Sequence, residues 1–230
     1  MRRRLVGGIV LVLLLLALDQ GARVFAQSEL RKRAAASVPE AGSVHASVRS
    51  FPFVGQLLVS GNVTAVTLRF DGIRSSTLTL ERVVLDLRGV VIDRNALIFE
   101  RRGQLNRIHR GTVTVDVTLA ALAAALHADV RASRGVLQIG REGLPVPAAI
   151  AVEAGDRLVF RVAGLPALSA VVPRMDLVPC RPSVAVTTTG LRLSCTTDHL
   201  PPSLVGRLGR AAAGGPPPAH PVRSEGTMSG

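Results

Sequence analysis

Tryptophan and tyrosine are absent from this chain of 230 residues, and phenylalanine occurs only six times. Sites for single-stranded nucleic acid usually stack bases on aromatic side chains, and sugar-binding clefts commonly use Trp or Tyr. The composition therefore argues against both kinds of site. An aliphatic groove for lipid needs neither residue, so the composition favours lipid over nucleic acid as the partner.

Lysine is almost absent too, because Lys32 is the only one and arginine carries the rest of a formal net charge of +12. A basic surface attracts anionic partners such as lipid headgroups or nucleic acid. The preference for arginine is explained equally well by a GC-rich genome.

The motifs of common enzyme classes are missing. The sequence has no Walker loop, no G-x-G-x-x-G, no H-E-x-x-H, no G-x-S-x-G and no paired-cysteine motif. Its five histidines are scattered, and none stands at metal-ligand spacing from another. Asp198 and His199 are adjacent, but no nucleophile accompanies them. We therefore predict no enzymatic activity, no metal and no cofactor.

Only two cysteines occur, Cys180 and Cys195. In an exported protein two cysteines most simply form one disulfide. The residues between them alternate on both sides of a turn at Thr189-Gly190, which predicts a hairpin. A bridge across its base would stabilise the fold by about 3 kcal/mol. A redox pair or a metal site is the alternative, but further ligands are lacking.

The N-terminus has the pattern of an export signal or a membrane anchor. Three arginines precede Leu5–Leu18, 14 residues without a charge, which suits a signal peptide better than the roughly 20 residues of a full span. Val24-Phe25-Ala26 offers a cleavage site before Gln27. The arginines place the N-terminus inside and the body outside the membrane. We predict a signal peptide or anchor over residues 1–26, and an exported protein at the outer face of the cytoplasmic membrane.

The alternative to cleavage is a helix that continues into the mature protein. Its apolar face would carry Ala22, Phe25, Ala26, Leu30 and Ala34, which fall at helical spacing.

Residues 44 to 198 are predicted to be mostly strands. Thr112–Leu119 alternates cleanly and leads into a helix over Leu119–Leu126, which Thr118 caps and His127 ends. A change of phase near Glu81-Arg82 predicts a bulge. Further strands and their turn are expected at 135–140, 146–153, 156–162 and 168–177, with a hairpin turn at 154–156. Residues 27–209 are predicted to form one domain, and the Gly- and Pro-rich residues 210–230 a disordered tail.

Residues 50–73 read SFPFVGQLLVSGNVTAVTLRFDGI, an apolar turn followed by a strand with Val66, Leu68 and Phe70 on one face. With the apolar segment upstream, this stretch resembles the LmeA-like phospholipid-binding proteins of actinobacterial cell envelopes. In that family an F-P-F-hydrophobic block precedes such a strand. Weaker resemblance extends over roughly residues 15 to 200.

The resemblance implies an α+β fold, in which a curved antiparallel sheet wraps around a helix in a tubular lipid-binding (TULIP-like) architecture. It implies a protein that holds phospholipid acyl chains in an apolar groove and acts in envelope lipid or lipoglycan homeostasis. Ordinary core packing is the alternative role for the candidate lipid-binding residues, which are Phe51, Phe53, Val54, Leu57, Leu58, Val66, Leu68 and Phe70.

Arginine is concentrated between residues 93 and 110, where Asp93 and Glu100 are the only acidic residues. The guanidinium fork matches phosphate oxygens, so an anionic headgroup is one interpretation and a solvated loop is the other. The candidate headgroup or membrane-surface residues are Arg101, Arg102, Arg107 and Arg110. The alternatives for the whole protein are an anchored structural or adaptor protein without a lipid ligand, and an envelope hydrolase or transferase.

Overall fold

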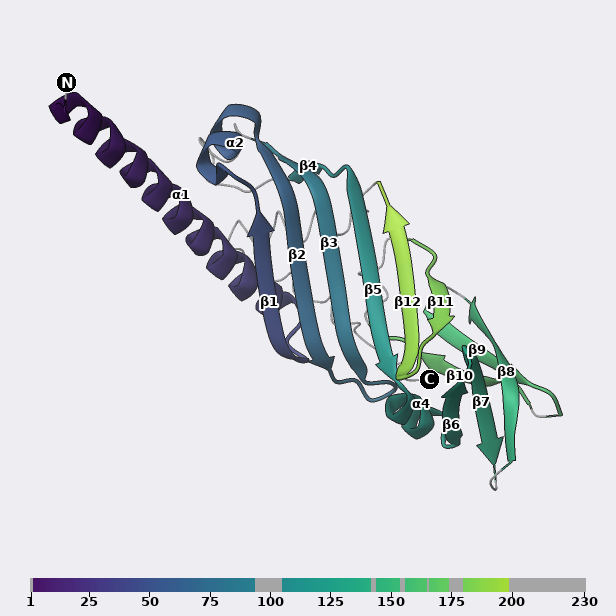
Figure 1. Ribbon diagram of the computed structural model, residues 1–230. Coiled ribbons are helices and arrows are strands. Elements are labelled where there is room, and N and C mark those ends of the chain that lie inside the picture. Colours follow the sequence, from purple (N-terminus) through teal and green to yellow (C-terminus); the bar gives the residue numbers. More distant parts are fainter. Residues whose placement is uncertain are drawn as a thin grey trace, which may run out of the picture.

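The computed structural model describes residues 2–93, 105–141, 144–153, 156–164, 166–173 and 180–198. In these ranges the protein is α+β, with a long N-terminal helix and antiparallel strands in two open sheets (Figure 1). The predicted fold class is confirmed. The predicted tail, residues 210–230, lies outside the described residues.

The larger sheet, sheet A, is built from long strands that curve side by side (Figure 1). Every neighbouring pair in it is antiparallel. Its order is β1 (Ala41–Arg49), β2 (Asn62–Ile73), β3 (Leu80–Ile92), β5 (Arg110–Thr118), β12 (Gly190–Thr197) and β11 (Ser183–Val186), and β4 (Leu105–Arg107) pairs with β3.

One face of sheet A is apolar because its strands alternate in register. In β5, Val113, Val115 and Val117 are buried, while Thr112 and Thr114 alternate with them on the opposite face. The partners of the three valines across β12 are apolar as well. This inner face carries Val66, Leu68, Phe70, Val83, Leu85, Leu87, Val113, Val115, Val117, Leu191, Leu193 and Cys195.

The bulge predicted near Glu81-Arg82 is wrong. Asp71 pairs with Arg82 and Ile73 with Leu80, so the β2–β3 register continues unbroken past this point. Gly72 has φ +65 in the opposite strand, and both strands change the phase of their side chains together. The change of phase in the sequence thus reflects an irregularity of the backbone at the same level in both paired strands, and not an extra residue in one of them. A register shift occurs farther along, between Val91 and Ile92.

The smaller sheet, sheet B, has five antiparallel strands. They follow the order β10 (Leu168–Val171), β9 (Arg157–Val162), β8 (Leu144–Glu153), β7 (Val136–Arg141) and β6 (Asp129–Ser133). Strands β7, β8 and β9 lie where the sequence predicted them, and Glu153 pairs with Arg157 across the expected β8–β9 hairpin. Residues 154 and 155 of that turn lie outside the described residues. Strand β6 was not predicted, and β10 ends at Val171, before the predicted end at residue 177.

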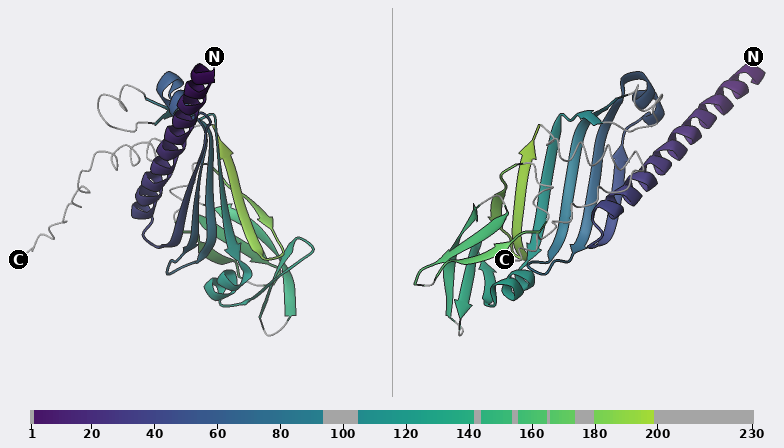
Figure 2. Two further views of the ribbon diagram at one scale, coloured as in Figure 1. Left: turned by 60° about the vertical axis from the view of Figure 1, so that its left-hand side comes forward. Right: turned by 180° about the vertical axis from the view of Figure 1, so that it is seen from behind.

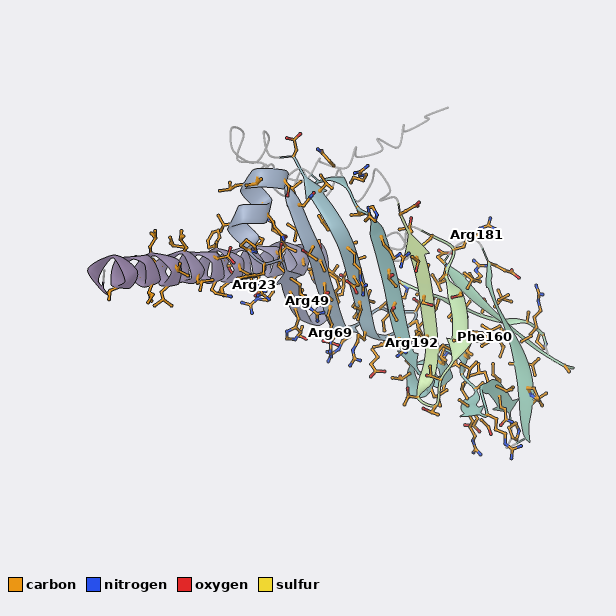
Figure 3. All side chains as sticks on the ribbon, turned by 45° about the horizontal axis from the view of Figure 1, so that its top comes forward. Arg23, Arg49, Arg69, Phe160, Arg181 and Arg192 are labelled. Atoms are coloured by element: carbon orange, nitrogen blue, oxygen red, sulfur yellow. A yellow bond between two sulfur atoms is a disulfide. The ribbon has the colours of Figure 1, made fainter. Side chains whose placement is uncertain are left out.

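Helix α4 (Leu119–Leu126) connects the two sheets. The Oγ1 of Thr118 accepts a hydrogen bond from the Ala121 amide at 3.1 Å, as predicted for the cap. Leu122 and Leu126 are buried in a core that joins the inner face of sheet A to sheet B, where Phe160 is fully buried (Figure 3).

Helix α1 (Arg2–Ser37) packs along β1 with its C-terminal part, and its N-terminal part extends away from the sheets (Figures 1 and 2). Ala22, Ala26, Leu30 and Ala34 contact the core, as predicted. The prediction that Phe25 belongs to that face is wrong, since Phe25 is 72% exposed. The stripe advances by four residues, and a neighbour in sequence points about 100° away from it.

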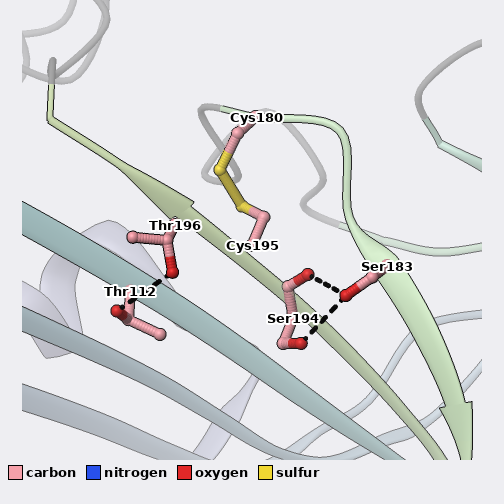
Figure 4. The surroundings of a disulfide bond; sticks show 6 residues. All are labelled: Thr112, Cys180, Ser183, Ser194, Cys195 and Thr196. Atoms are coloured by element: carbon pink, nitrogen blue, oxygen red, sulfur yellow. Dashed lines mark hydrogen bonds between the residues drawn. A yellow bond between two sulfur atoms is a disulfide. The ribbon is translucent and has the colours of Figure 1, made fainter.

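The predicted disulfide is present between Cys180 and Cys195 (Figure 4). It closes the β11–β12 hairpin, whose turn is held by the Thr187 amide donating to the Gly190 carbonyl at 2.8 Å. Beside the bridge, the Ser183 hydroxyl donates to the Ser194 carbonyl at 2.9 Å. The sulfur of Cys195 belongs to the inner face of sheet A.

Candidate functional site

The phenylalanine-proline block forms the start of a short helix, α2 (Phe53–Ser60). Pro52 is the N-cap in an extended conformation, and its side chain makes no capping bond. The helix ends at Gly61, whose φ of 68 is left-handed and whose amide donates to the Leu57 carbonyl at 3.1 Å. Proline and glycine therefore set both ends of α2.

The missing cap is supplied by α1. The Val54 amide donates to Oδ1 of Asp19 at 2.7 Å, across 35 residues of sequence. A carboxylate at a helix N-terminus satisfies a free amide and complements the helix dipole. Asp19 is 6% exposed, and among the described residues its Oδ2 has no hydrogen-bond partner. This polar contact fixes α2 to α1.

Two more side chains of α1 bind the end of β1. The Arg23 Nε donates to the Val48 carbonyl at 2.8 Å, and Gln27 donates to the same oxygen at 3.4 Å. Beneath them lies a second apolar cluster, the junction core, which joins α1, α2 and one end of sheet A. It consists of Val48, Phe53, Val63, Val66, Leu87, Val90 and Ile108, with Ala22, Ala26, Leu30, Val54 and Leu57 packed against it.

The structure divides the candidate lipid-binding residues into three groups. Phe53, Val54, Leu57 and Val66 belong to the junction core. Leu68 and Phe70 lie farther along the inner face, in the main core. Phe51 and Leu58 are exposed, at 62% and 51%. The eight residues therefore do not line one open groove.

A hollow of about 410 Å³ lies beside α2, at the end of sheet A. Its walls combine two basic side chains with hydroxyl and amide groups. They are Gln56, Ser60, Asn62, Val63, Thr64, Gly89, Val91, Arg107 and His109. The Arg107 guanidinium can pair there with an anionic group, beside the apolar side chains of Val63 and Val91.

The shape of the hollow depends on Gly89 and Gln56. A Cβ on Gly89 would lie 2.7 Å from the Cβ of His109, and Gly89 has φ +58. The Gln56 amide nitrogen donates to the Phe51 carbonyl at 3.1 Å, and its oxygen accepts from Thr64 at 3.2 Å. Neither residue was among the predicted site residues. Gln56 stands in an apolar stretch, and the close approach of Gly89 to His109 exists only in the folded chain.

Of the candidate headgroup residues, Arg107 lines this hollow. Arg110 does not line it. It lies opposite Arg88 in the β3–β5 register, on the polar outer face of sheet A. Arg101 and Arg102 lie outside the described residues.

Much of the charge on the outer face is paired. Asp71 accepts hydrogen bonds from Arg69 at 2.9 Å and Arg82 at 3.2 Å, and Asp116 accepts one from Arg192 at 2.7 Å (Figure 3 labels Arg69 and Arg192). Desolvation raises the pKa of the Asp71 carboxyl, but the hydrogen bonds and charges of the two arginines outweigh it and hold this pKa below its usual value. Asp116 raises the pKa of Arg192 further above its ordinary value.

In the described part of the chain, no group of three His, Cys, Asp or Glu side chains is arranged to hold a metal ion.

The chain matches one protein-family model, described as LmeA-like phospholipid-binding, over residues 17–216. No curated protein gives a match, and neither does any solved structure.

Proposed function

The chain belongs to the LmeA-like phospholipid-binding family, and we propose from this that it holds the acyl chains of a phospholipid against the inner face of sheet A. In this proposal the protein is exported, stays at the outer face of the cytoplasmic membrane and serves envelope lipid or lipoglycan homeostasis without catalysing a reaction. The observation that carries the proposal is the continuous apolar inner face, which crosses β2, β3, β5 and β12.

The inner face offers apolar contact along whole strands. Val66, Leu68 and Phe70 of β2 are 9%, 8% and 6% exposed, and their partners in β3 are Leu87, Leu85 and Val83. Because these side chains are already buried, acyl chains reach them only if the elements packed on this face separate. Contact with lipid would then replace contact between apolar side chains, which costs little free energy per unit of area.

The headgroup is proposed to lie in the hollow beside α2. Arg107 supplies positive charge there, and Asn62, Thr64 and His109 supply polar groups. The hollow adjoins Val63 of the junction core, so a phosphate in it would stand close to the apolar face. We expect an anionic phospholipid to be preferred for this reason.

Retention of α1 as an anchor is part of the proposal. Among the described residues, α1 is the helix long and apolar enough to cross a membrane, with a mean hydropathy of 2.0 in its most apolar window. Cleavage after Ala26 would remove Asp19 and Arg23, which bind α2 and β1. The disulfide is typical of proteins outside the reducing cytosol.

A single introduced tryptophan can test acyl-chain binding, because the natural chain has none. Phe70→Trp places the fluorophore on the inner face, and Thr67→Trp places it on the outer face of the same strand. Full-length variants are reconstituted in vesicles whose phospholipids carry brominated acyl chains, which quench tryptophan on contact. We expect emission to fall for Phe70→Trp and not for Thr67→Trp. Equal emission from Phe70→Trp in brominated and ordinary vesicles would argue against the proposal.

The headgroup site has a matched pair of variants. Arg107→Ala removes a cation from the hollow, and Arg110→Ala removes an exposed cation outside it. Mass spectrometry of lipid extracted from the purified protein should show a loss of anionic phospholipid for Arg107→Ala alone. Equal losses would indicate a general effect of charge.

The closed packing of the inner face also favours a second candidate, an anchored structural or adaptor protein of the envelope. No phospholipid in the extract, together with one dominant protein captured by crosslinking, would support this candidate.

A further inference from the structure

We propose that α2 and the adjoining turns of α1 form an apolar collar that inserts into the outer face of the cytoplasmic membrane. The folded body, meaning the two sheets with α2 and α4, would then contact the bilayer directly and would not be tethered by α1 alone. The collar is defined as Val24, Phe25, Phe51, Leu58 and Val59. Its partner is the phospholipid bilayer. This inference rests on the proposed retention of α1 as an anchor, and it adds the surface and depth at which the body meets lipid.

The first argument is length. Leu5–Leu18 is 14 residues, which gives about 21 Å of helix. The hydrocarbon core of a bilayer is about 30 Å thick. A helix that reaches this thickness from Leu5 must include the turns up to about Ala26, so residues 19–26 belong at the lipid boundary. Thinning of the bilayer is the other response to a short span, and it carries a cost.

The second argument is the state of the polar groups at that level. Asp19 and Arg23 would be expensive in an apolar environment if they were unpaired. Both are turned toward the body, where Asp19 accepts from the Val54 amide and Arg23 donates to the Val48 carbonyl. Asp19 is also buried by protein. Gln20 is the exposed polar side chain of these turns.

The third argument is what faces outward. Val24 and Phe25 are 63% and 72% exposed on α1, and Phe51 is 62% exposed at the start of α2. Leu58 and Val59 add exposed apolar area on the same helix. The Asp19–Val54 bond places α2 at the level of Asp19, beside α1 (Figure 1). Exposed apolar residues gathered next to an apolar span are typical of an interface with lipid.

The fourth argument is charge. Arg31 and Lys32 are exposed on α1 beyond the collar, about 7 Å along the helix from Ala26. At that distance from the hydrocarbon boundary they would meet phosphate groups, with which cations pair. The sequence of layers along α1 is thus apolar span, collar and basic turn. A protein partner would not require this order, whereas a bilayer does.

The position of the collar also determines the depth of the hollow relative to the bilayer. Gln56 and Ser60 of α2 line it, so a collar at the lipid boundary brings the hollow to the depth of the headgroups. A phospholipid could then pass between bilayer and protein without its phosphate crossing open water.

The test uses single tryptophans in the full-length chain, reconstituted in vesicles of phosphatidylcholine and phosphatidylglycerol with brominated acyl chains. Phe51→Trp and Phe25→Trp report on the collar. Val136→Trp is the control, because Val136 is an exposed apolar residue, at 43%, on β7 of sheet B. We expect bromolipid to quench both collar positions and to leave Val136→Trp unchanged.

The result that overturns the collar is emission from Phe51→Trp and Phe25→Trp that equals the emission in ordinary vesicles. Quenching of Phe25→Trp alone overturns it too, because α2 would then lie outside the lipid. These outcomes are independent of the proposed groove. The groove fails if Phe70→Trp is not quenched, whatever the collar shows, and a quenched Phe70→Trp with an unquenched collar leaves the groove standing.

Discussion

Single residues on the outer face of sheet A hold their conformation through charge. Asp71 bridges Arg69 within β2 and Arg82 on β3, and the same strands carry a looser contact of 3.7 Å between Arg88 and Asp86. The apolar side chains that alternate with these residues are buried in the core. The outer face therefore contributes to pairing of the strands through its ion pairs.

Asp71→Asn tests that contribution. The folded pKa of Asp71 is lowered, so its stabilising effect is complete above the unfolded pKa near 4 and disappears as the pH falls through the folded value. We expect Asp71→Asn to lower stability at pH 7 by about 0.2–1 kcal/mol and to approach the natural protein at pH 2–3. Far-UV circular dichroism during thermal unfolding measures this. Asp86→Asn, with the longer contact, should change less, and a pH-independent difference for Asp71→Asn would refute the assignment.

At position 190 the neighbouring strand leaves no room for a side chain. A Cβ at this position would overlap the carbonyl oxygen of Val117 in the paired strand β5. Backbone cannot yield as a flexible side chain does, so we expect Gly190→Ala to destabilise the protein by about 3 kcal/mol or more. Gly42→Ala in β1 is the matched control, since its Cβ would rest 3.4 Å from the Asp71 carbonyl. Similar melting temperatures for the two variants would contradict the prediction.

At the scale of elements, α2 depends on a group from another helix. Asp19→Leu removes the acceptor for the Val54 amide, while Asp19→Asn keeps an oxygen there. We expect hydrogen exchange across residues 53–60 to accelerate in Asp19→Leu and to stay near the natural rate in Asp19→Asn, because the loss of a cap costs about 1 kcal/mol. Gln20→Leu serves as a control on the adjacent exposed position. Unchanged exchange in Asp19→Leu would mean that packing alone holds α2.

Elements whose signals are local were predictable from the sequence. The helix that Thr118 caps, strand β5 and the β11–β12 hairpin depend on neighbours a few residues away, and the disulfide joins cysteines only 15 residues apart. The bond from Val54 to Asp19 was not predictable, because it joins residues 35 apart. The same holds for the change of side-chain phase at Gly72, which occurs in β2 and β3 together. Considered in β3 alone, this change of phase predicted a bulge.

The candidate site was predictable in part. Alternation identified which residues of β2 face inward, and Arg107 was placed among the candidate headgroup residues. Alternation does not show what covers a face, so the split of these residues between the junction core and the main core could not be foreseen. Phe51 and Phe53 lie two residues apart, yet one is exposed and the other buried, because α2 begins between them.

For the whole molecule, the proposed orientation in the membrane is linked to formation of the disulfide. Arginines 2–4 precede the apolar span, and positive charge is retained on the cytoplasmic side. In the proposed orientation the body and its two cysteines lie outside, where the thiols can oxidise. The redox state of Cys180 and Cys195 therefore reports which side of the membrane the body occupies.

Replacing Arg2, Arg3 and Arg4 with Glu should weaken that orientation and leave part of the protein with reduced cysteines. Acid-quenched cells treated with a polyethylene glycol maleimide, without reductant, would then show a doubly shifted band. The natural chain should show none, since its described cysteines are both in the disulfide. Arg31→Glu with Lys32→Glu is the matched control, because removing positive charge beyond the span favours the same orientation. Oxidised cysteines in the Arg2–Arg4 variant would show that the span is oriented by something other than these charges.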